Sequence, residues 1–476
     1  MPGQSFEESY TFPMLSIVPS LQPALDPGFL PAALWNRAYL ALVDRDPAAR
    51  PLAITLDRCD GSISRFESRV FSSAHPAAGL NLRYVERLLK FLLWQKGGCD
   101  VLVAGADEVT AQLAKIYSET GERHFDHGFM GDTVYRRPFR IRAAKLADLP
   151  LALTSGLPVG RHLDGCRIGF DIGGSERKVA ALIDGEVVFS EEVAWNPYFQ
   201  KDPAYHIERV HVSLQRAAAH LPRVDAIGGS AAGVYVKNEV RIASLFRGVA
   251  PELFEQHIRR MFFTLRDRWG GVPFEVANDG EVAALAGSMS LNENAVLGVS
   301  MGTSMAGGYV RPGGDITPWL NELAFAPVDY NPAASRDEWS GDAGCGVQYF
   351  SQQGVVRYAR GAGFEFTSDQ TVPDQLFAVQ QAFAAGDGRA RSVYETVGTC
   401  FGYALGHYAD FYDFNHLLLL GGTTSGEGGA IILDRATAVL QADFPALAAR
   451  LRLHMPDEKS KRHGQAIAAA SLPALR

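Results

Sequence analysis

The chain has 476 residues, more than a single ordinary hydrophobic core organises, so two or three domains are expected. Hydrophobic residues make up 47% of it and charged residues 21%, a balance typical of a soluble globular protein and not of a disordered one. The formal net charge is −8, with acidic and basic residues interspersed, which argues against nucleic acid as a partner because phosphates require a basic face.

No segment of the sequence is typical of a membrane span or a secretory signal. The longest apolar run, near 417–420, is far shorter than the roughly 20 residues that cross a bilayer. Residues 1–10 have neither the basic region nor the apolar stretch of a signal peptide. The cysteines are scattered, odd in number and form no CxxC pair, which is typical of reduced thiols. We therefore expect a cytoplasmic protein with no membrane partner.

The N-terminal third has α/β character. Residues 11–31 are rich in Pro and Leu without a clear period, which indicates an extended segment that wraps the surface. Apolar residues at helical spacing predict a helix over 82–92, and a strand follows at 101–104. The stretch 51–62 superficially resembles 167–175, which leaves a duplicated half-domain open, although we prefer an unrelated α/β extension.

From about residue 165 the strands and glycine turns recur in a regular rhythm. Strands are predicted at 167–170 and 178–183, and Asp184-Gly185 predicts a hairpin after the second. A helix is predicted over 207–221 and a further strand at 224–227. The order strand, hairpin, helix, strand describes an α/β half-domain.

The same pattern returns further along the chain. Strands are predicted at 274–277, 295–300 and 415–420, with a helix over 281–287 after the first of them. Such a repetition is itself a structural signature. The sequence thus predicts a first lobe and a second lobe of similar construction.

These patterns divide the chain into three regions. An N-terminal α/β extension covers 1–164, the first lobe covers 165–290 and the second lobe covers 291–476. We expect the extension to pack on the first lobe or to complete it.

The first candidate site is a turn between two strands. Gly173, Gly174 and Ser175 lie between Asp171 and Lys178. Glycines in such a turn let backbone N–H groups approach a phosphate, and a serine hydroxyl adds a donor. An aspartate at a strand end can hold Mg²⁺, usually through water, because that ion prefers oxygen ligands and keeps part of its hydration shell. By itself this turn is more often an ordinary β-hairpin.

A second turn of the same kind lies in the other lobe. Gly302, Thr303 and Ser304 follow a buried strand and precede another, so two hairpins could grip one polyphosphate. Gly421 and Gly422 end a later strand and could let a flat adenine ring lie on backbone. Each turn alone is equally typical of an ordinary loop.

Asn278 and Asp279 stand at the end of a predicted strand. A carboxylate there can accept the proton of a substrate hydroxyl as it attacks a γ-phosphoryl group. Either residue could instead cap the helix that follows. The glycine-rich stretch 228–233 also follows a strand, and we assign Gly229 and Ser230 to substrate binding.

Taken in this order, the motifs resemble those of the bacterial ROK family of sugar kinases, over about 166–476. Residues 171–175 look like its first phosphate motif, 302–308 like its second and 420–422 like its adenosine motif. The resemblance implies two actin-like (ribonuclease H-like) lobes around a central cleft. It also implies ATP and Mg²⁺ as cofactors, and a homodimer.

By the same resemblance, Asp279 is the general base, Asn278 contacts the substrate and Glu322 remains from the sugar-binding motif. The chain departs from the family at Phe325, which replaces a histidine, and at Val347, which replaces a second sugar-contacting glutamate. These two positions suggest a more apolar or differently substituted acceptor than glucose, such as an amino sugar, an N-acetylated sugar or a polyol.

A further departure concerns zinc. The cysteine-rich zinc loop of the family corresponds to 338–345, where Cys345 remains but Glu338 and Ser340 stand where two thiolates are expected. A structural zinc needs four Cys or His ligands. The sequence therefore predicts no zinc.

The sequence favours an ATP-dependent phosphotransferase that acts on a hydroxyl of a sugar or sugar-like small molecule. The alternative is a non-catalytic sugar or nucleotide sensor, although such a protein would be free to lose Asp279. A DNA-binding regulator is disfavoured, because residues 1–164 show no compact three-helix pattern with a basic recognition helix.

Overall fold

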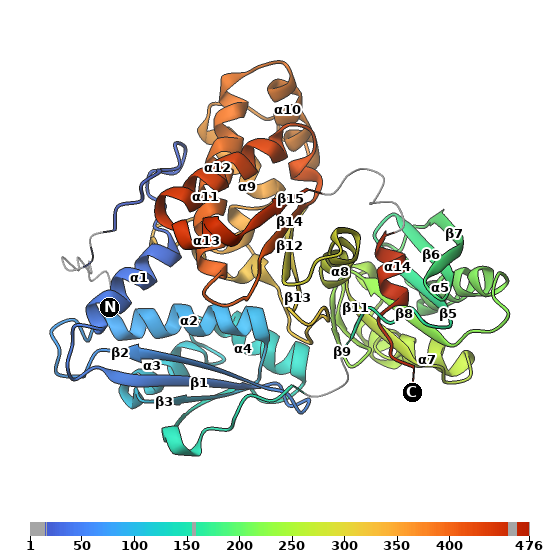
Figure 1. The fold of residues 1–476 in the computed structure, drawn as a ribbon, viewed down its shortest axis with the longest axis horizontal. Coiled ribbons are helices and arrows are strands. Elements are labelled where there is room, and N and C mark those ends of the chain that lie inside the picture. Colours follow the sequence, from blue (N-terminus) through green and yellow to red (C-terminus); the bar gives the residue numbers. More distant parts are fainter. Residues whose placement is uncertain (1–14, 16, 155–158, 456–463, 476) are drawn as a thin grey trace, which may run out of the picture.

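The computed structural model describes most of the chain and groups its elements into three bodies (Figure 1). The described residues are 15, 17–154, 159–455 and 464–475. Residues 1–10, on which the expectation about a secretory signal rests, lie outside them, as do 11–14 and 16 of the expected wrapping segment. No helix in the described part of the chain is long and apolar enough to span a membrane.

The N-terminal body is a four-stranded sheet with helices packed against it. The strand order is β2-β1-β3-β4, in which β3 runs antiparallel to β1 and parallel to β4. The strands are β1 (Arg50–Asp57), β2 (Ile63–Val70), β3 (Asp100–Ala104) and β4 (Arg140–Ala144), and the helices are α2 (Leu80–Lys96), α3 (Asp107–Ile116) and α4 (His124–Gly128). The predicted helix at 82–92 and strand at 101–104 are confirmed.

The first lobe is built on a five-stranded sheet of order β11-β8-β5-β6-β7. Its strands are β5 (Cys166–Ile172), β6 (Glu176–Ile183), β7 (Glu186–Ala194), β8 (Ala226–Ala231) and β11 (Phe274–Asn278). Strands β5, β8 and β11 are parallel, so their carboxyl ends meet at one edge. The predicted strand at 224–227 begins later and runs on through Gly228 and Gly229, which therefore lie inside β8. In the N-terminal sheet, by contrast, both neighbours of β1 are antiparallel to it, so the two sheets differ in topology.

The helices of this lobe include one from the far end of the chain. They are α5 (Pro203–Ala218), α6 (Pro251–Leu253), α7 (Met261–Arg268), α8 (Asp279–Leu291) and α14 (Gly464–Ala470), with the short strands β9 (Val234–Val236) and β10 (Glu239–Ile242) beside them. Helix α14 lies on the sheet because Gly169 and Gly228 lack side chains, and a Cβ at either would collide with a backbone carbonyl of α14. The C-terminal helix thus packs on the first lobe although it follows the second in sequence (Figure 1).

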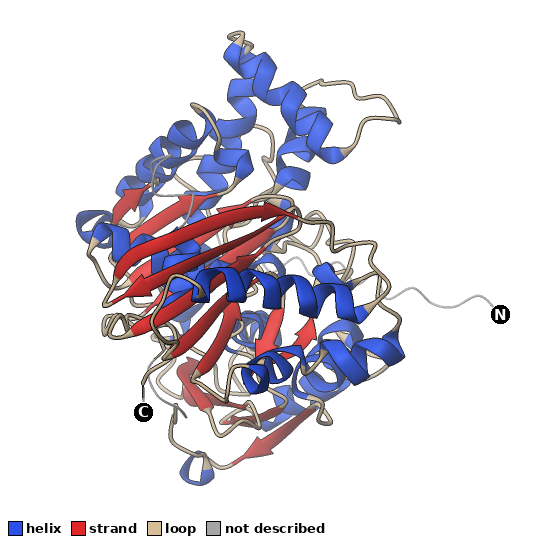
Figure 2. Ribbon diagram, turned by 90° about the vertical axis from the view of Figure 1, so that its right-hand side faces the viewer, coloured by secondary structure: helices blue, strands red, loops and turns tan. Residues whose placement is uncertain are grey.

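The second lobe contains a four-stranded sheet of order β13-β12-β14-β15 and a layer of helices. The strands are β12 (Val296–Met301), β13 (Met305–Val310), β14 (His416–Leu420) and β15 (Arg452–His454). The helices are α9 (Gln352–Gly361), α10 (Val372–Ala384), α11 (Gly388–Tyr408), α12 (Gly428–Asp443) and α13 (Pro445–Arg450). Seen from the side, the strands gather in the middle of the molecule with helices outside them (Figure 2).

The N-terminal body shares its hydrophobic core with the second lobe, and it also contacts the first lobe, where we had expected it, through an ion pair of Arg136 with Glu255 at 2.7 Å. Residues of β1, α2, α11 and β14 belong to one continuous hydrophobic core, whereas the core of the first lobe is separate. Helix α1 (Ala32–Val43) and the segment before it lie along the second lobe, where the backbone N–H of Leu21 donates to the Tyr403 hydroxyl at 3.1 Å. Helix α2 is buried on nearly all sides, polar residues such as Arg87 and Lys90 included, so it packs against both its own sheet and the second lobe.

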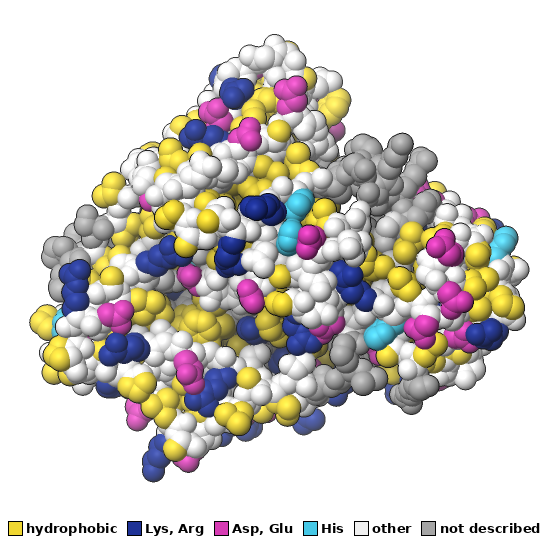
Figure 3. Space-filling model, viewed as in Figure 1, with side chains coloured by type: hydrophobic (Ala, Val, Ile, Leu, Met, Phe, Trp, Pro, Cys, Tyr) yellow, Lys and Arg dark blue, Asp and Glu magenta, His cyan; other side chains and the backbone are white. Residues whose placement is uncertain are grey.

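The surface carries charges of both signs. On the face shown in Figure 3, Lys and Arg side chains are interspersed with Asp and Glu, as the sequence composition leads one to expect.

Candidate functional site

Three carboxyl ends of parallel strands bring the predicted polar residues of the first lobe together. Asp171 on β5 is in register with Ser230 on β8, whose neighbour Ala231 is in register with Asn278 on β11. The Ser230 hydroxyl donates to Asp171 Oδ1 at 2.6 Å. In open α/β sheets this edge is where ligands bind.

Asp171 is a largely buried carboxylate at the start of the first glycine turn. Burial raises its pKa, against the lowering effects of the Ser230 hydrogen bond and of Lys178. Lys178 stands opposite Asp171 across the β5–β6 hairpin and lies 3.8 Å from Glu176 through its Nζ. The turn therefore places the carboxylate of Asp171 and the ammonium group of Lys178 on the same face of the sheet.

The glycines of this turn have specific neighbours. The Gly173 carbonyl accepts a hydrogen bond of 2.8 Å from the Trp195 indole, and a side chain at Gly174 would collide with the hydroxyl of Tyr198. Ser175 is exposed beside them. The turn is thus held in shape from one side by two aromatic residues.

The second glycine turn and the later Gly421-Gly422 pair lie in contact. Gly302 closes the β12–β13 hairpin by donating to the Ser304 carbonyl at 2.9 Å, and Thr303 and Ser304 are exposed at the tip. Gly421, at φ +100°, packs directly on the backbone of Met301, the residue immediately before that turn. The structure therefore combines two motifs that are about 120 positions apart in sequence.

Asn278 and Asp279 have separate roles at the N-terminus of α8. The Asn278 side chain caps the helix by accepting from the Gly280 N–H at 2.8 Å, and its Nδ2 donates to the Gly233 carbonyl at 2.8 Å. Burial, and then the charge of Asp171, raise the pKa of Asp279 to about 6. No Lys or Arg among the described residues forms an ion pair with Asp279. Asp279 Oδ1 also accepts from the Gly280 N–H, at 3.0 Å, so this one N–H is shared between the two side chains.

Two further carboxylates lie close by. Burial and the charge of Asp279 raise the pKa of Glu322 to about 7. Burial raises the pKa of Glu281 to about 8, while hydrogen bonds from Asn321 and the Tyr309 N–H lower it. Sequence reasoning missed Glu281, which lies two positions after Asp279 in the first turn of α8 and is only 3% exposed.

A pocket of about 840 Å³ adjoins these groups. Asn278, Glu281 and Glu322 contribute to its wall, together with residues of β9 and β11. Arg58 and Asp60, from the turn between β1 and β2, line it from the N-terminal body. Its volume lies in the upper part of the range of about 300–1,000 Å³ that is usual for small-molecule sites.

Gly229 and Ser230, which we assigned to substrate binding, lie in the interior of β8. The ring of Phe170 covers Gly229, and Ser230 is fully buried. In this position Ser230 orients the carboxylate of Asp171.

The two positions that depart from the sugar-binding motif are turned into the core. Phe325 stacks on Trp94 of α2 with ring centroids 4.3 Å apart and also contacts Phe125 and Phe129. Val347 is 6% exposed and belongs to the same core. Neither residue lines the pocket, so the reason for expecting an apolar acceptor loses its structural basis.

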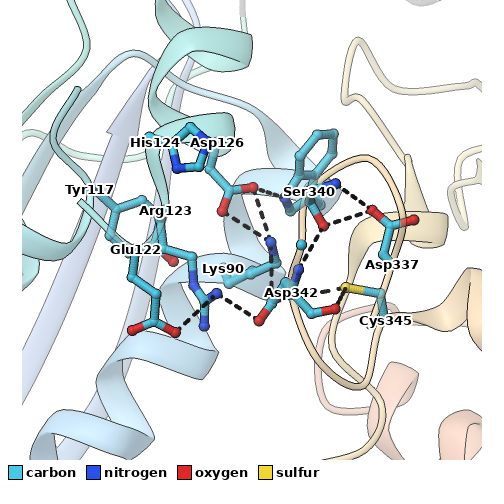
Figure 4. Close-up of polar contacts among 12 residues, drawn as sticks. Lys90, Tyr117, Glu122, Arg123, His124, Asp126, Asp337, Ser340, Asp342 and Cys345 are labelled. Carbon is cyan, nitrogen blue, oxygen red and sulfur yellow. Dashed lines mark hydrogen bonds and ion pairs between the residues drawn. The ribbon is translucent and has the colours of Figure 1, made fainter. Parts of the chain in front are cut away.

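The loop that replaces the zinc loop is held by ion pairs with the N-terminal body (Figure 4). Asp342 pairs with Arg87, Lys90 and Arg123 at 3.1, 3.2 and 2.6 Å. Burial raises the pKa of Asp342, but the three cations outweigh it and hold that pKa well below its usual range. Lys90 also pairs with Asp126 at 3.0 Å.

Metal-ligating groups are sparse around this loop. Cys345 is buried, with its Sγ 3.8 Å from the Asp342 carbonyl. No group of three or more His, Cys, Asp or Glu side chains in the described ranges could hold a metal. What fastens the loop here is the buried ion cluster.

Helix α2 also holds Glu322. The carbonyls of Gln95 and Trp94, near the C-terminal end of α2, accept the N–H groups of Asn321 and Glu322, each at 3.0 Å. These carbonyls have no partners within the helix, so they are free to bind another segment. One helix of the N-terminal body thereby positions the glutamate, the aromatic residue that follows it and the loop beyond.

No family model and no curated protein sequence matches the chain. Several solved structures do match the chain. A ROK hexokinase from Thermus thermophilus is 18% identical, covers 65% of this chain and 97% of its own, and superposes with a TM-score of 0.51. A ROK glucokinase from Streptomyces griseus, solved with glucose and AMPPNP, is 20% identical over 65% and 99% of the two chains, with a TM-score of 0.46.

A ROK family transcriptional regulator, described as a homologue of the E. coli MLC protein, is 19% identical over 65% of this chain and 79% of its own, with a TM-score of 0.48. A likeness at this sequence identity establishes only the fold. The structure that supports this conclusion is the hexokinase, with its TM-score of 0.51. The chain has the two-lobed, actin-like fold of that ROK hexokinase over about two thirds of its length.

Proposed function

We propose that the protein is a kinase that moves the γ-phosphoryl group of ATP to a hydroxyl of a sugar or sugar-like molecule. The observation that carries the proposal is Asp279, a half-buried carboxylate with a pKa raised to about 6 and no cationic partner among the described residues. It lies at a strand end beside a pocket that Asn278 and Glu322 line. A general base works best when its pKa is near the working pH, and Asp279 meets this condition.

The residues around Asp279 then take complementary roles. Asp279 accepts the proton of the acceptor hydroxyl as that oxygen attacks phosphorus. Asn278 and Glu322 hold neighbouring hydroxyl groups, and Glu281 keeps Asn321 and the backbone of Tyr309 in place. Positioning and electrostatics of this kind account for most of the catalysis in phosphoryl transfer.

We assign the nucleotide to the two glycine hairpins. Gly173, Gly174, Ser175 and Lys178 would contact phosphate oxygens from the first lobe. From the second lobe, phosphate would lie against Gly302, Thr303 and Ser304, and adenosine against Gly421 and Gly422. In support of this assignment, Gly421 packs on the backbone of Met301, immediately before the Gly302 turn, so one ligand can touch both.

The donor set suits Mg²⁺ held through water. Asp171 lies close enough to Asp279 for its charge to raise the pKa of the latter, so two carboxylates face one region. Mg²⁺ favours oxygen donors and retains water, and it neutralises charge on transferring phosphates. Since the described residues offer no direct three-ligand site, we assign Asp171 a contact through water.

The proposal is tested with Asp279→Asn in an ADP-release assay over hexoses, amino sugars, polyols and sugar acids. We expect kcat to fall by about 10²–10⁴-fold, the range of a lost general base, while calorimetry shows unchanged ATP binding. Asp434→Asn, at an exposed aspartate on α12 to which no role is assigned, is the matched control and should retain most of the turnover. Near-wild-type turnover in Asp279→Asn would refute the assigned base.

A non-catalytic sensor is the second candidate. It is favoured by Phe325 and Val347, two apolar residues that pack against the core where the family's sugar site has polar side chains. The same calorimetry distinguishes the two, because a sensor binds nucleotide and sugar without releasing ADP.

A further inference from the structure

Two cysteines that are 40 positions apart in the sequence meet in the N-terminal body. Cys59 lies in the turn between β1 and β2, and Cys99 directly precedes β3. Their Sγ atoms are 2.7 Å apart. Two sulfur atoms this close need only a small shift to reach the roughly 2.0 Å of a disulfide bond. The fold therefore brings together two thiols that no CxxC spacing connects.

The backbone holds both thiols in this arrangement. Strands β1 and β3 are antiparallel with Asp57 opposite Asp100, and the Cys99 N–H donates to the Asp57 carbonyl at 3.0 Å. Cys59 has a φ of +56°, which an L-residue adopts only at a cost. The Asp57 carboxylate keeps it there by accepting the Cys59 N–H at 2.7 Å. The approach of the two sulfur atoms is thus built into paired strands and a fixed turn.

The two thiols differ in their access to solvent. Cys59 is exposed, whereas Cys99 is buried. Burial, and then the contact with Cys59, raise the pKa of Cys99 well above its usual range. A dissolved oxidant therefore reaches Cys59 first, and Cys99 is held where a second thiol can complete a bond. The other cysteines, Cys166, Cys345 and Cys400, are all buried.

We propose that Cys59 and Cys99 form a reversible disulfide, with a low-molecular-weight disulfide such as oxidised glutathione as the oxidant. Cys59 loses its proton to water, and its thiolate attacks one glutathione sulfur, which releases the first glutathione thiolate and leaves a mixed disulfide. Cys99 then attacks the Cys59 sulfur, and the second glutathione leaves with the Cys99 proton. The two cysteines lose two electrons, and two molecules of reduced glutathione form. Reduced glutathione reverses both steps, because the sulfur of Cys59 stays accessible.

The disulfide links two parts of the acceptor side of the site. The residues on either side of Cys59, Arg58 and Asp60, line the pocket. Two glycines separate Cys99 from the end of α2, whose C-terminal carbonyls hold the Glu322 segment. Closing the bond draws the β1–β2 turn toward the end of α2 and so displaces part of the pocket wall. This consequence rests on the proposed function, whereas the disulfide itself does not.

The first experiment counts thiols in the full chain and requires no substrate. The reduced chain is incubated with oxidised glutathione, unfolded, alkylated and analysed by mass spectrometry. We expect the five thiols to fall to three, with peptide mapping placing the bond between Cys59 and Cys99, and reduced glutathione to restore all five. Five thiols after oxidation, or a bond between other cysteines, would overturn the proposal.

Two variants test the order of the steps. Cys59→Ser removes the exposed thiol, so its thiol count should not change with the oxidant. Cys99→Ala keeps the exposed thiol but has no second one, so one glutathione should stay attached to Cys59 and appear as a gain in mass. Cys166→Ala, at the start of β5, is the matched control and should form the disulfide as the wild type does. Loss of two thiols in Cys59→Ser would contradict the assignment.

Steady-state kinetics on the oxidised and reduced chain test the link to the pocket. We expect oxidation to raise the acceptor KM about threefold or more, because small displacements of positioning residues are costly, and to leave the ATP KM unchanged. Cys59→Ser should show no difference between the two treatments. Equal acceptor KM values in both forms of the wild type overturn the link. If neither form releases ADP, the kinase assignment fails, while the thiol count still decides the disulfide.

Discussion

The two halves of the candidate site are built in different ways. The nucleotide half, by which we mean residues 171–178, 302–304 and 421–423, consists of turns whose form is set by nearby residues. The acceptor half, by which we mean Asn278, Glu281, Glu322 and the pocket wall, depends through Glu322 on a helix more than 220 positions earlier in the chain. A site built from one short segment can be recognised as a sequence motif. A site built from distant elements appears in the sequence only as scattered residues.

The two halves differ because only the acceptor half is held by α2. A turn such as Gly302–Ser304 closes with a hydrogen bond between neighbours. Glu322, however, is oriented by carbonyls at the end of α2, and the loop at Asp342 is fastened by α2 cations. We therefore expect substitutions in the N-terminal body to alter the acceptor half of the site and to leave the nucleotide half unaffected.

The largest expected effect comes from the buried ion cluster. Lys90→Met removes a fully buried cation and leaves Asp126 and Asp342 short of a partner. Breaking a buried pair in this way costs about 3–5 kcal/mol. Chemical denaturation monitors the loss, with Lys115→Met, at an exposed lysine on α3, as the control. A loss below about 1 kcal/mol would show that the cluster does not fasten the loop.

Phe325→Ala tests the aromatic contact between α2 and the Glu322 segment. Phe325 is half-buried against Trp94, so we expect a loss of about 2–3 kcal/mol and a raised KM for the acceptor but not for ATP. The control is Phe377→Ala on α10, whose side chain is 58% exposed. Equal increases in both KM values would mean that the two halves are not independent.

The pH profile tests the environment of Asp279. Its carboxylate must be ionised to accept a proton, and its pKa is about 6. The ionised fraction, and with it kcat/KM, should rise about tenfold between pH 5 and pH 7 and then level off. A rising limb centred below pH 5 would indicate that Asp279 is solvated like an ordinary aspartate.

The smallest effect is expected in the nucleotide half. The Thr423 hydroxyl donates to the Met301 carbonyl at 2.6 Å, next to the Gly302 turn. Thr423→Val removes this one bond and should cost about 1 kcal/mol of stability. Because the turn is locally determined, ATP affinity should weaken only a few-fold and the acceptor KM should not change. Calorimetry with ATP and steady-state kinetics measure both quantities.

Several predictions from the sequence were confirmed because the relevant signals are local. The hairpin at Asp184-Gly185 and the helix after Asp279 both form as expected, since their turn and cap residues act within a few positions. Glu281 was missed because a glutamate in the first turn of a helix is ordinary, and only the neighbouring Tyr309 and Asn321 make it a buried acid. The pairing of α2 with the second lobe was missed for the same reason.

The sequence by itself determined the alternation of strands and helices, the glycine hairpins and the position of Asp279 at the end of a strand. These follow from side-chain period, turn chemistry and capping, which act over short distances. The tertiary structure alone decided that Phe325 faces Trp94, that Asp342 meets Arg87 and Lys90, and that Lys96 lies over the ring of Trp319. Those facts depend on which surfaces come together, and burial then sets the charge and the chemistry of each group.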